Sequence, residues 1–388
     1  MFPDLIERLR KREQQGLLRQ RKILESPQSS QVTMDGRDYL AFCSNDYLGL
    51  ANHLDLIESV SKGARRYGVG ASASHMINGH FSAHHVLEEA LAEFAGFPQA
   101  LLFSTGYMAN IGAVTALVGR EDAIFSDKLN HASLNDAALL SRAKFIRYPH
   151  ADLALLDQRL STTNARRKLV ISDAVFSMEG DIAPIPELVA VCEKHQAVLL
   201  LDDAHGFGVL GRQGRGSLFL PDCGSIHSPN IIYMATLGKA AGVFGAFVAA
   251  QAEVIETLIQ SAHSYIYTTA TPPLLAQALM VSLKLIQQDE WRRNVLTQNI
   301  VQLKEALQSL PWKLLPSSTP IQPLMIGESA EAVCISQRLR ERGILVPAIR
   351  PPTVAQGTAR LRISLSAEHQ PCDLMRLAEA LQEIALQV

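Results

Sequence analysis

The chain has 388 residues, of which 47% are hydrophobic and 19% are charged, and its net charge is −2. This composition is typical of a globular protein with a large core, and the length predicts two domains. A general nucleic-acid binder would need a basic face, and the longest apolar run, Ala240–Ala250, is too short to cross a membrane. We therefore expect neither nucleic acid nor a membrane as a partner.

The number and spacing of the cysteines indicate the cellular compartment. The five cysteines are scattered without a Cys-x-x-Cys pair, and their number is odd. This pattern predicts reduced thiols in a cytoplasmic protein, with no disulfide framework and no metal site. Residues 1–15 are charged and lack the apolar core of a signal peptide.

The N-terminal part begins with a predicted helix over residues 4–25. Its many lysine and arginine side chains indicate a solvent-exposed helix face. A short strand is expected at residues 39–44. The motif SNDYLGL at 44–50 then marks a turn, because Asn-Asp and Gly are turn residues. Asn45 is either a ligand-binding residue or part of this turn chemistry.

Residues 67–80 are rich in Gly, Ser and Ala. Such a segment is either a flexible connection or a loop that lets the backbone approach a ligand closely. Residues 81–96 follow with apolar residues at helical spacing, and Gly96 is a plausible end of that helix.

From residue 100 onward, short apolar strands alternate with helical segments. The strand at 100–103, the turn at 104–107 and the helix at 108–118 place free N–H groups at a helix N-terminus, where anions bind. The strands are nearly continuously apolar, which predicts a doubly wound, mostly parallel α/β sheet over roughly residues 50–260. Further strands are expected at 123–126, 144–148, 168–173, 197–202, 230–235 and 245–250, and helices at 132–141, 153–160 and 186–195.

After Tyr267 the pattern changes to a smaller α+β domain. We expect three domain segments: residues 1–49 joining the small domain, a large α/β domain at 50–270, and the small domain at 271–388. Helices are predicted at 272–288, 290–310, 330–342 and 371–387, and strands after Pro323, near 344–347 and at 359–365.

The stretch ATLGKAAGVFGAF at 235–247 places Lys239 just past a strand. A lysine can form a Schiff base with an aldehyde such as pyridoxal 5'-phosphate (PLP) if its pKa falls to about 7–8 from about 10.4. Apolar neighbours would desolvate the ammonium and lower its pKa. Thr236 offers a hydroxyl for a phosphate. The alternative is a surface lysine in a loop.

A carboxylate and a histidine follow the strand at 197–202, which is one strand earlier than the strand that precedes Lys239. Asp202 closes the run LLLDD and either caps the next helix or keeps a pyridine nitrogen of PLP protonated. His205 lies where it could contact the ring oxygen. His131 opens a helix and either caps it or stacks on a ring, and Ser177 is either a turn residue or a cofactor ligand.

Six motifs run nearly from end to end of the chain: SNDYLGL (44–50), HASL (131–134), VFSMEGD (175–181), DDAHG (202–206), TLGK (236–239) and IRPPTV (349–354). Together they resemble the α-oxoamine synthases, which are fold-type I PLP enzymes with the aspartate-aminotransferase-like fold. The motif IRPPTV, with GTARLR at 357–362, favours the family member that acts in biotin synthesis.

The resemblance implies a role for each matching residue. In the catalytic centre Lys239 carries the cofactor, Asp202 holds the pyridinium, His205 contacts the ring oxygen and His131 stacks on the ring. The other implied cofactor-binding residues are Gly106, Tyr107, Ser177 and Thr236, and the implied substrate-binding residues are Arg19, Asn45, His131, Arg350 and Thr353.

The resemblance also implies the reaction: a decarboxylative condensation of L-alanine with pimeloyl-CoA or pimeloyl-[acyl-carrier protein], by a homodimer. The open alternatives are a sister synthase, such as glycine C-acetyltransferase or 5-aminolevulinate synthase, a PLP-binding regulator without catalysis, and a purely structural interaction protein. Residues 1–40 are too short for the regulator's DNA-binding helix-turn-helix.

Three residues depart from the family pattern and bear on fine substrate contacts. Asp173 stands where a glutamate is common, Phe207 where a small or hydroxyl residue is common, and Asn78 replaces a usual serine.

Overall fold

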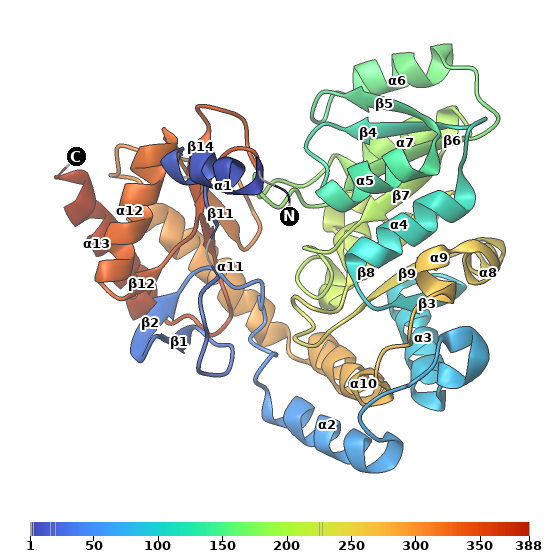
Figure 1. Ribbon diagram of the computed structural model, residues 1–388, viewed down its shortest axis with the longest axis horizontal. Helices are drawn as coiled ribbons and strands as arrows, with labels where there is room; N and C mark the ends of the chain where they lie inside the picture. Colours follow the sequence, from blue (N-terminus) through green and yellow to red (C-terminus); the bar gives the residue numbers. More distant parts are fainter. Residues whose placement is uncertain are drawn as a thin grey trace. The chain divides into compact units, whose positions relative to one another are not determined.

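The computed structural model describes residues 2, 4–15, 17–19, 21–224, 226 and 228–387 (Figure 1). They form two compact units, and each is described by itself. The large unit comprises residues 46–177 and 181–295, and the small unit comprises residues 1–45, 178–180 and 296–388.

A seven-stranded sheet forms the centre of the large unit, in the order β3-β9-β8-β7-β6-β4-β5 (Figure 1). Neighbouring strands from β8 to β5 are parallel, whereas β9 is antiparallel to both β8 and β3. The predicted mostly parallel sheet is confirmed. Its strands are β3 (Gln99–Phe103), β4 (Ala123–Asp127), β5 (Lys144–Tyr148), β6 (Lys168–Asp173), β7 (Val198–Asp202), β8 (Ile231–Thr236) and β9 (Ala246–Ala250).

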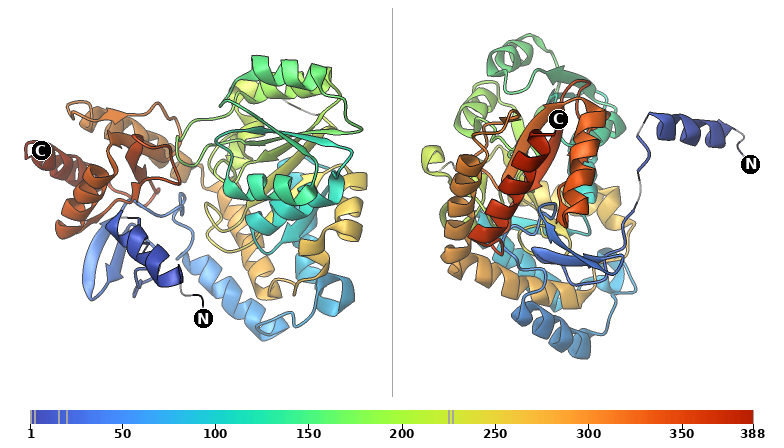
Figure 2. Two further views of the ribbon diagram at one scale, coloured as in Figure 1. Left: turned by 45° about the horizontal axis from the view of Figure 1, so that its top comes forward. Right: turned by 90° about the vertical axis from the view of Figure 1, so that its left-hand side faces the viewer.

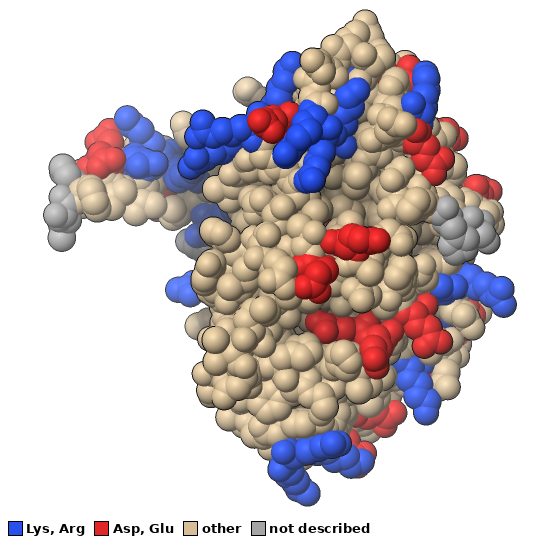
Figure 3. Space-filling view, turned by 90° about the vertical axis from the view of Figure 1, so that its right-hand side faces the viewer, with Lys and Arg blue, Asp and Glu red and all other residues tan. Residues whose placement is uncertain are grey.

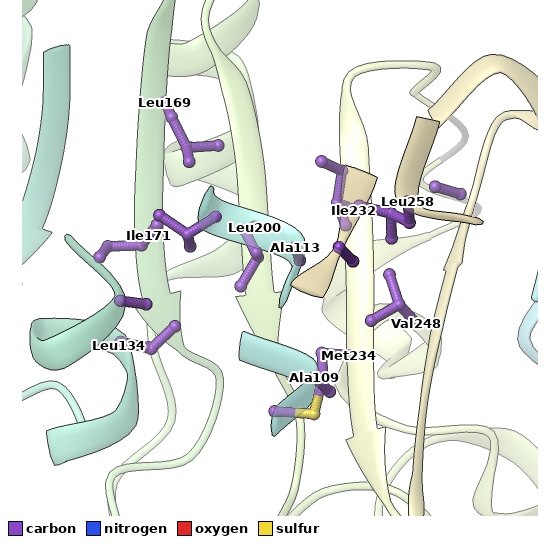
Figure 4. Packing of buried hydrophobic residues seen from close by; sticks show 14 of the residues in the cluster. Ala109, Ala113, Leu134, Leu169, Ile171, Leu200, Ile232, Met234, Val248 and Leu258 are labelled. Atoms are coloured by element: carbon purple, nitrogen blue, oxygen red, sulfur yellow. The ribbon is translucent and has the colours of Figure 1, made fainter. Parts of the chain in front are cut away.

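Helices cover both faces of this sheet. On one face, α4, α5 and α8 bury Ala113, Leu134 and Leu258 against Leu200 and Ile232 of the strands (Figure 4). Helices α3 and α7 contact the sheet through residues outside this cluster. Strands apolar on both faces therefore form a buried layer. The helices are α2 (Leu54–Tyr67), α3 (Ser82–Ala95), α4 (Gly106–Leu117), α5 (Ala132–Ser141), α6 (Leu153–Thr162), α7 (Ile185–Lys194), α8 (Ala252–Ser261), α9 (His263–Ile266) and α10 (Pro273–Gln288).

The carboxyl ends of three neighbouring strands bring polar residues to one edge of the sheet. Asp173 at the end of β6 is the register partner of Asp202 at the end of β7. Thr236 ends β8, two residues beyond the partner of Asp202. Ligands of doubly wound sheets bind at this edge.

The Gly-rich segment at 67–80 is a folded connection. It includes one turn of π-helix at His75–Gly79 and leads directly into α3. Only glycine fits at Gly79, since a Cβ there would lie 2.2 Å from the carbonyl oxygen of Ala73. The same carbonyl accepts a hydrogen bond from the N–H of Ala270 at 2.9 Å, which ties the segment to the chain after α9.

The described residues of the small unit form two sheets and three helices of their own. A three-stranded sheet has the order β1-β2-β12, and an antiparallel four-stranded sheet has the order β10-β11-β14-β13. Helix α11 (Glu290–Ala306) begins in the large unit and ends in the small one. The remaining elements are α1 (Asp4–Gln14), β1 (Gln31–Met34), β2 (Arg37–Ala41), β10 (Lys313–Leu314), β11 (Ile321–Gly327), α12 (Ser329–Glu341), β12 (Ile344–Leu345), β13 (Ala348–Ile349), β14 (Ala359–Ser364) and α13 (Pro371–Ala385).

Two expectations about the N-terminal and middle regions were wrong. The predicted helix over 4–25 ends at Gln14, and none of its described residues is buried, so no packing sustains it further. Residues 271–295, expected in the small domain, group with the large unit because α10 packs on α2 and α3. Among the described residues, no helix is both long and apolar enough to cross a membrane.

Candidate active site

Lys239 lies in a tight loop that joins β8 to β9. The N–H of Leu237 donates to the carbonyl of Gly245 at 2.8 Å, and the N–H of Gly242 donates to the carbonyl of Lys239 at 2.8 Å. Gly242 has a positive φ of 69°, and a Cβ there would lie 2.6 Å from the backbone of Leu50. Glycine at this position therefore allows the loop to fold and fixes where Lys239 begins.

The amine of Lys239 is held by a chain of hydrogen bonds. Its Nζ lies 2.8 Å from Nε2 of His205, and Nδ1 of His205 lies 2.7 Å from the hydroxyl of Tyr47. His205 and Tyr47 are both buried. Lys239, predicted to be either a catalytic lysine or a surface lysine in a loop, is half-buried and oriented by two buried side chains.

Asp202 is buried at the end of β7, and both of its carboxylate oxygens accept hydrogen bonds. Oδ1 accepts from the N–H of Ala204 at 3.0 Å within a turn at residues 204–209, where the capping alternative had expected a helix. Oδ2 accepts from Nδ2 of Asn110 at 2.7 Å. A carboxylate held on two sides has a fixed direction, which is what an ion pair with a ring cation requires.

The next residue, Asp203, points into a separate buried network. Its carboxylate accepts from the N–H and hydroxyl of Ser217 at 2.7 and 2.5 Å and from the hydroxyl of Tyr233 at 2.9 Å. Burial raises the pKa of Asp203 to about 6, against the opposing effect of these hydrogen bonds.

His131 and Asp173 form the third side of the site. His131 caps α5: its N–H donates to Oδ2 of Asp173 at 2.9 Å, and its Nδ1 accepts from the N–H of Ser133 at 3.2 Å. Burial lowers the pKa of His131, although the charge of Asp202 opposes this. Burial and the charge of Asp202 raise the pKa of Asp173 well above its usual range.

Ser177 is carried by a short hairpin whose ends pair at Val175 and Ile182. His150 anchors this hairpin, with Nε2 2.8 Å from Asp181 and Nδ1 3.1 Å from Asp127 at the end of β4. Burial lowers the pKa of His150, but the two carboxylates outweigh it and raise the pKa to about 10. The ion pairs thus fix the hairpin to the sheet edge.

Helix α4 presents its N-terminus on the remaining side. Thr105 caps the helix by accepting from the N–H of Met108 at 3.2 Å. Gly106 lies close to Thr236, because a Cβ on Gly106 would be 3.9 Å from the Cβ of Thr236. A helix N-terminus beside a hydroxyl is an anion site. The hydroxyl of Tyr107 donates to Asp136.

All the residues predicted to bind a cofactor line one cavity of about 190 Å³ in the large unit. The structure brings together side chains that are far apart in the sequence, with an amine, a buried carboxylate, two imidazoles and a helix N-terminus around one space. They are Gly106, Tyr107, His131, Ser177, Asp202, His205, Thr236 and Lys239.

The model of the family described as aminotransferase class I and II matches residues 37–381. The chain belongs to this family. It is 67% identical over 385 residues to an 8-amino-7-oxononanoate synthase of Nitrosomonas eutropha, covering 99% of this chain and 100% of the relative. It is 66% identical over 385 residues to the protein of the same name in Nitrosomonas europaea, with the same coverage.

Two solved structures are similar to this chain over most or all of its length. A structure of SPT with a PLP internal aldimine has a TM-score of 0.92 at 30% identity, covering 100% of this chain and 98% of that chain. A Francisella tularensis 8-amino-7-oxononanoate synthase has a TM-score of 0.77 at 31% identity, covering 90% and 98%.

The predicted substrate-binding residues other than His131 belong to the small unit of this aminotransferase-family chain. Arg19 donates from Nη2 to the hydroxyl of Thr353 at 3.5 Å. Oδ1 of Asn45 accepts from both terminal nitrogens of Arg362 at 3.2 Å. The carbonyl of Arg350 accepts from the N–H of Thr353 at 3.1 Å, so these two lie in one turn.

Two residues that position the site were not predicted from the sequence. Asn110 is fully buried and donates to Asp202 and to Ser133, and Tyr47 contacts His205. Asn110 could have been found as a polar residue inside an otherwise apolar helix. A buried amide needs a hydrogen-bond partner, so such a residue indicates a polar contact. Tyr47 lies in a motif that the sequence analysis singled out, but there only Asn45 was considered.

Proposed function

We propose that the chain is a PLP-dependent acyltransferase that condenses L-alanine with a pimeloyl thioester. The products are 8-amino-7-oxononanoate, CO2 and the free thiol, and the reaction belongs to biotin synthesis. The 67% identity over 385 residues to a relative named for this activity carries the proposal. The motifs IRPPTV and GTARLR, which favoured the biotin-synthesis member from the sequence, agree with it.

The cavity fits PLP at three separate groups. Lys239 offers a primary amine to the aldehyde, and Asp202 offers a buried carboxylate to the pyridine nitrogen. Gly106 and Tyr107 at the N-terminus of α4, with the hydroxyl of Thr236, suit the phosphate. An amine, a carboxylate and an anion site around one space match the chemical groups of this cofactor.

Bound PLP withdraws electrons from the Cα of the amino acid and so makes its proton acidic. Asp202 keeps the pyridine nitrogen protonated, which the pair of hydrogen bonds from Ala204 and Asn110 supports by fixing the carboxylate. Lys239 then accepts the Cα proton at Nζ and later returns one to the product. His205, itself bonded to Tyr47, orients that amine.

Residues of the small unit are proposed to bind the substrates. An arginine fork can bind a carboxylate with two parallel hydrogen bonds. Arg350 and Arg19 are candidates for the far carboxyl group or ester of the pimeloyl chain, with Thr353 beside them. Asn45 is a further candidate, on the strength of its place in the SNDYLGL motif.

A homodimer is part of the proposal. The large unit exposes large apolar side chains on the Gly-rich segment and around its loops, among them Val69, Ile77 and Tyr267, each more than three-quarters exposed at 80%, 80% and 76%. Exposed apolar surface of this kind marks an interface. All five cysteines are free thiols, which fits the proposed cytoplasmic location.

Mass spectrometry of the products tests the activity. The protein is incubated with L-alanine and, in parallel, with pimeloyl-CoA or a pimeloyl-carrier protein, and 8-amino-7-oxononanoate is the expected product. Glycine with acetyl-CoA and glycine with succinyl-CoA serve as controls. Turnover of a control pair without product from the pimeloyl thioesters would identify a sister synthase instead. Sedimentation of a fully active monomer would contradict the homodimer.

A further inference from the structure

A second group of titratable side chains lies in the large unit, in a groove of about 660 Å³ lined by residues of α3, α8 and the Gly-rich segment. Figure 3 views the molecule from the side on which α3, α8 and α9 lie in Figure 1, and acidic side chains gather across the middle of this surface. Three histidines, His75, His80 and His85, line the groove together with Glu88 and Glu89. None of them belongs to the cavity around Lys239.

His80, His85 and Glu88 each offer one ligand atom, and these atoms lie within 4.8 Å of one another. His85 and Glu88 are three residues apart on α3 and therefore share a helix face. His80 comes from the segment just before the helix, with Nε2 3.8 Å from Oε2 of Glu88. Two imidazoles and a carboxylate are a ligand set used by zinc sites that keep an open position.

The buried member, Glu88, has one oxygen hydrogen-bonded and the other close to His80. Its Oε1 accepts from the N–H of Leu102 at 2.9 Å, which fixes the side chain, while Oε2 lies 3.8 Å from Nε2 of His80. A buried carboxylate is costly without a nearby positive charge, and a divalent cation would supply one.

The second nitrogen of His80 is also positioned. Nδ1 of His80 lies 3.0 Å from Nδ1 of His75, and His75 stacks on Tyr265 with ring centroids 4.9 Å apart. Metal-binding histidines are commonly oriented by a hydrogen bond at the nitrogen that does not bind the metal. His75 thus turns Nε2 of His80 toward Glu88 and His85.

A competing set, His75, His80 and His84, also has ligand atoms within 4.8 Å. However, both ring nitrogens of His84 are engaged: Nε2 donates to the carbonyl of Thr271 at 2.8 Å, and Nδ1 accepts from the N–H of Phe81 at 3.1 Å. His84 would have to give up one of these bonds, so its role is to hold the helix start.

We propose that His80, His85 and Glu88 form a binding site for a divalent transition metal such as Zn²⁺, oriented by His75. The bound metal would join the Gly-rich segment to α3. It has no part in the proposed condensation, since its ligands lie outside the cavity around Lys239. No metal site was predicted from the sequence, because that prediction rested on the spacing of the cysteines and not on these histidines.

The test uses untagged full-length protein with its PLP bound, treated with a chelator and dialysed. Calorimetric titration with ZnCl2 should give one site per protomer. The variants His85→Ala and Glu88→Gln should each weaken that site at least about tenfold, and His75→Ala by about 10- to 100-fold. A matched control, His263→Ala, removes an exposed histidine of α9 outside the groove and should bind like the wild type.

Two further measurements protect the test against misfolding and against other metal-binding groups. Zn²⁺ should raise the melting temperature of the wild type and of His263→Ala but not of His85→Ala, whose exposed side chain is not needed for folding. Co²⁺ should give the absorption bands of a four-coordinate site, lost in Glu88→Gln. Unchanged affinity in His85→Ala and Glu88→Gln, or no stoichiometric Zn²⁺ binding to the wild type, would overturn the proposal.

Discussion

The carboxyl edge of the large sheet and the polar residues of the small unit are held in different ways. At the sheet edge, Asp202 and His205 are buried and each has two hydrogen-bond partners. In the small unit, Arg19 and Thr353 are exposed, and the hydrogen bond between them is 3.5 Å long, at the limit of such a bond. The proposed cofactor end is therefore preorganised, whereas the proposed acyl end can adapt to its ligand.

The largest effect is expected at Lys239. Lys239→Ala should lower turnover by more than about 10⁴-fold, because acid–base catalysis alone contributes about 10²–10⁴ and the covalent attachment is lost as well. Absorbance titration should still detect weak PLP binding. Borohydride reduction of the wild type followed by peptide mapping should find the cofactor on Lys239, and a label on any other lysine would contradict the assignment.

Asp202→Asn should come next, with turnover reduced roughly 150- to 5,000-fold, because breaking a buried ion pair costs about 3–5 kcal/mol. The variant should fold, because Asn110 can turn its buried Oδ1 toward the new amide. This oxygen has no hydrogen-bond partner among the described residues. Circular dichroism checks the fold. Near-normal turnover would mean that Asp202 only caps the turn.

A smaller and more selective effect is expected at Arg350. Arg350→Ala should raise KM for the pimeloyl donor by roughly 10- to 150-fold and leave KM for alanine unchanged, since a charge-assisted hydrogen bond is worth about 1.5–3 kcal/mol. Arg37→Ala, an exposed arginine of β2, is the matched control and should leave both constants unchanged. Equal losses for both substrates, or none, would make Arg350 structural and Arg19 the next candidate.

The smallest effect concerns how the sheet edge is fixed. The pKa of His150 rises from 6.5 to about 10 in the folded protein, so its ion pairs stabilise fully below pH 6.5 and are lost as the pH rises through 10. The melting temperature of the wild type should therefore exceed that of His150→Gln by more below pH 6.5 than near pH 10. A difference that does not change with pH would assign His150 a packing role only.

Several elements of the large unit were predictable from the sequence. The bounds of β5, β6 and α5 match the predicted residues 144–148, 168–173 and 132–141, because apolar residues between polar turns locate them. The overlong prediction for α1 has the opposite cause: a charged helix with no buried face has no pattern that shows where it ends.

The site was predictable only where its residues lie in short motifs. Lys239, Asp202 and His131 follow strands or open helices, and the family resemblance selected them; they line one cavity, and their roles stay predictions. Asn110 and Tyr47 act through partners 92 and 158 residues away along the chain, and periodicity carries no information about such contacts. The histidine groove was missed for the same reason, since His75 and His80 gain their roles from α3 and α9.

The two neighbouring carboxylates at the end of β7 carry a further consequence. Asp202 faces the cavity, while Asp203 is enclosed by Ser217 and Tyr233. Successive side chains of an extended chain point to opposite faces, so deleting one residue in β7 would move Asp203 into the place of Asp202. Asp203 would then face the cavity, and Asp202 would lose Asn110. Chimaeras that join this chain to a relative should therefore keep β7 and its DDAHG motif in one piece, whereas joints in exposed loops leave this order intact.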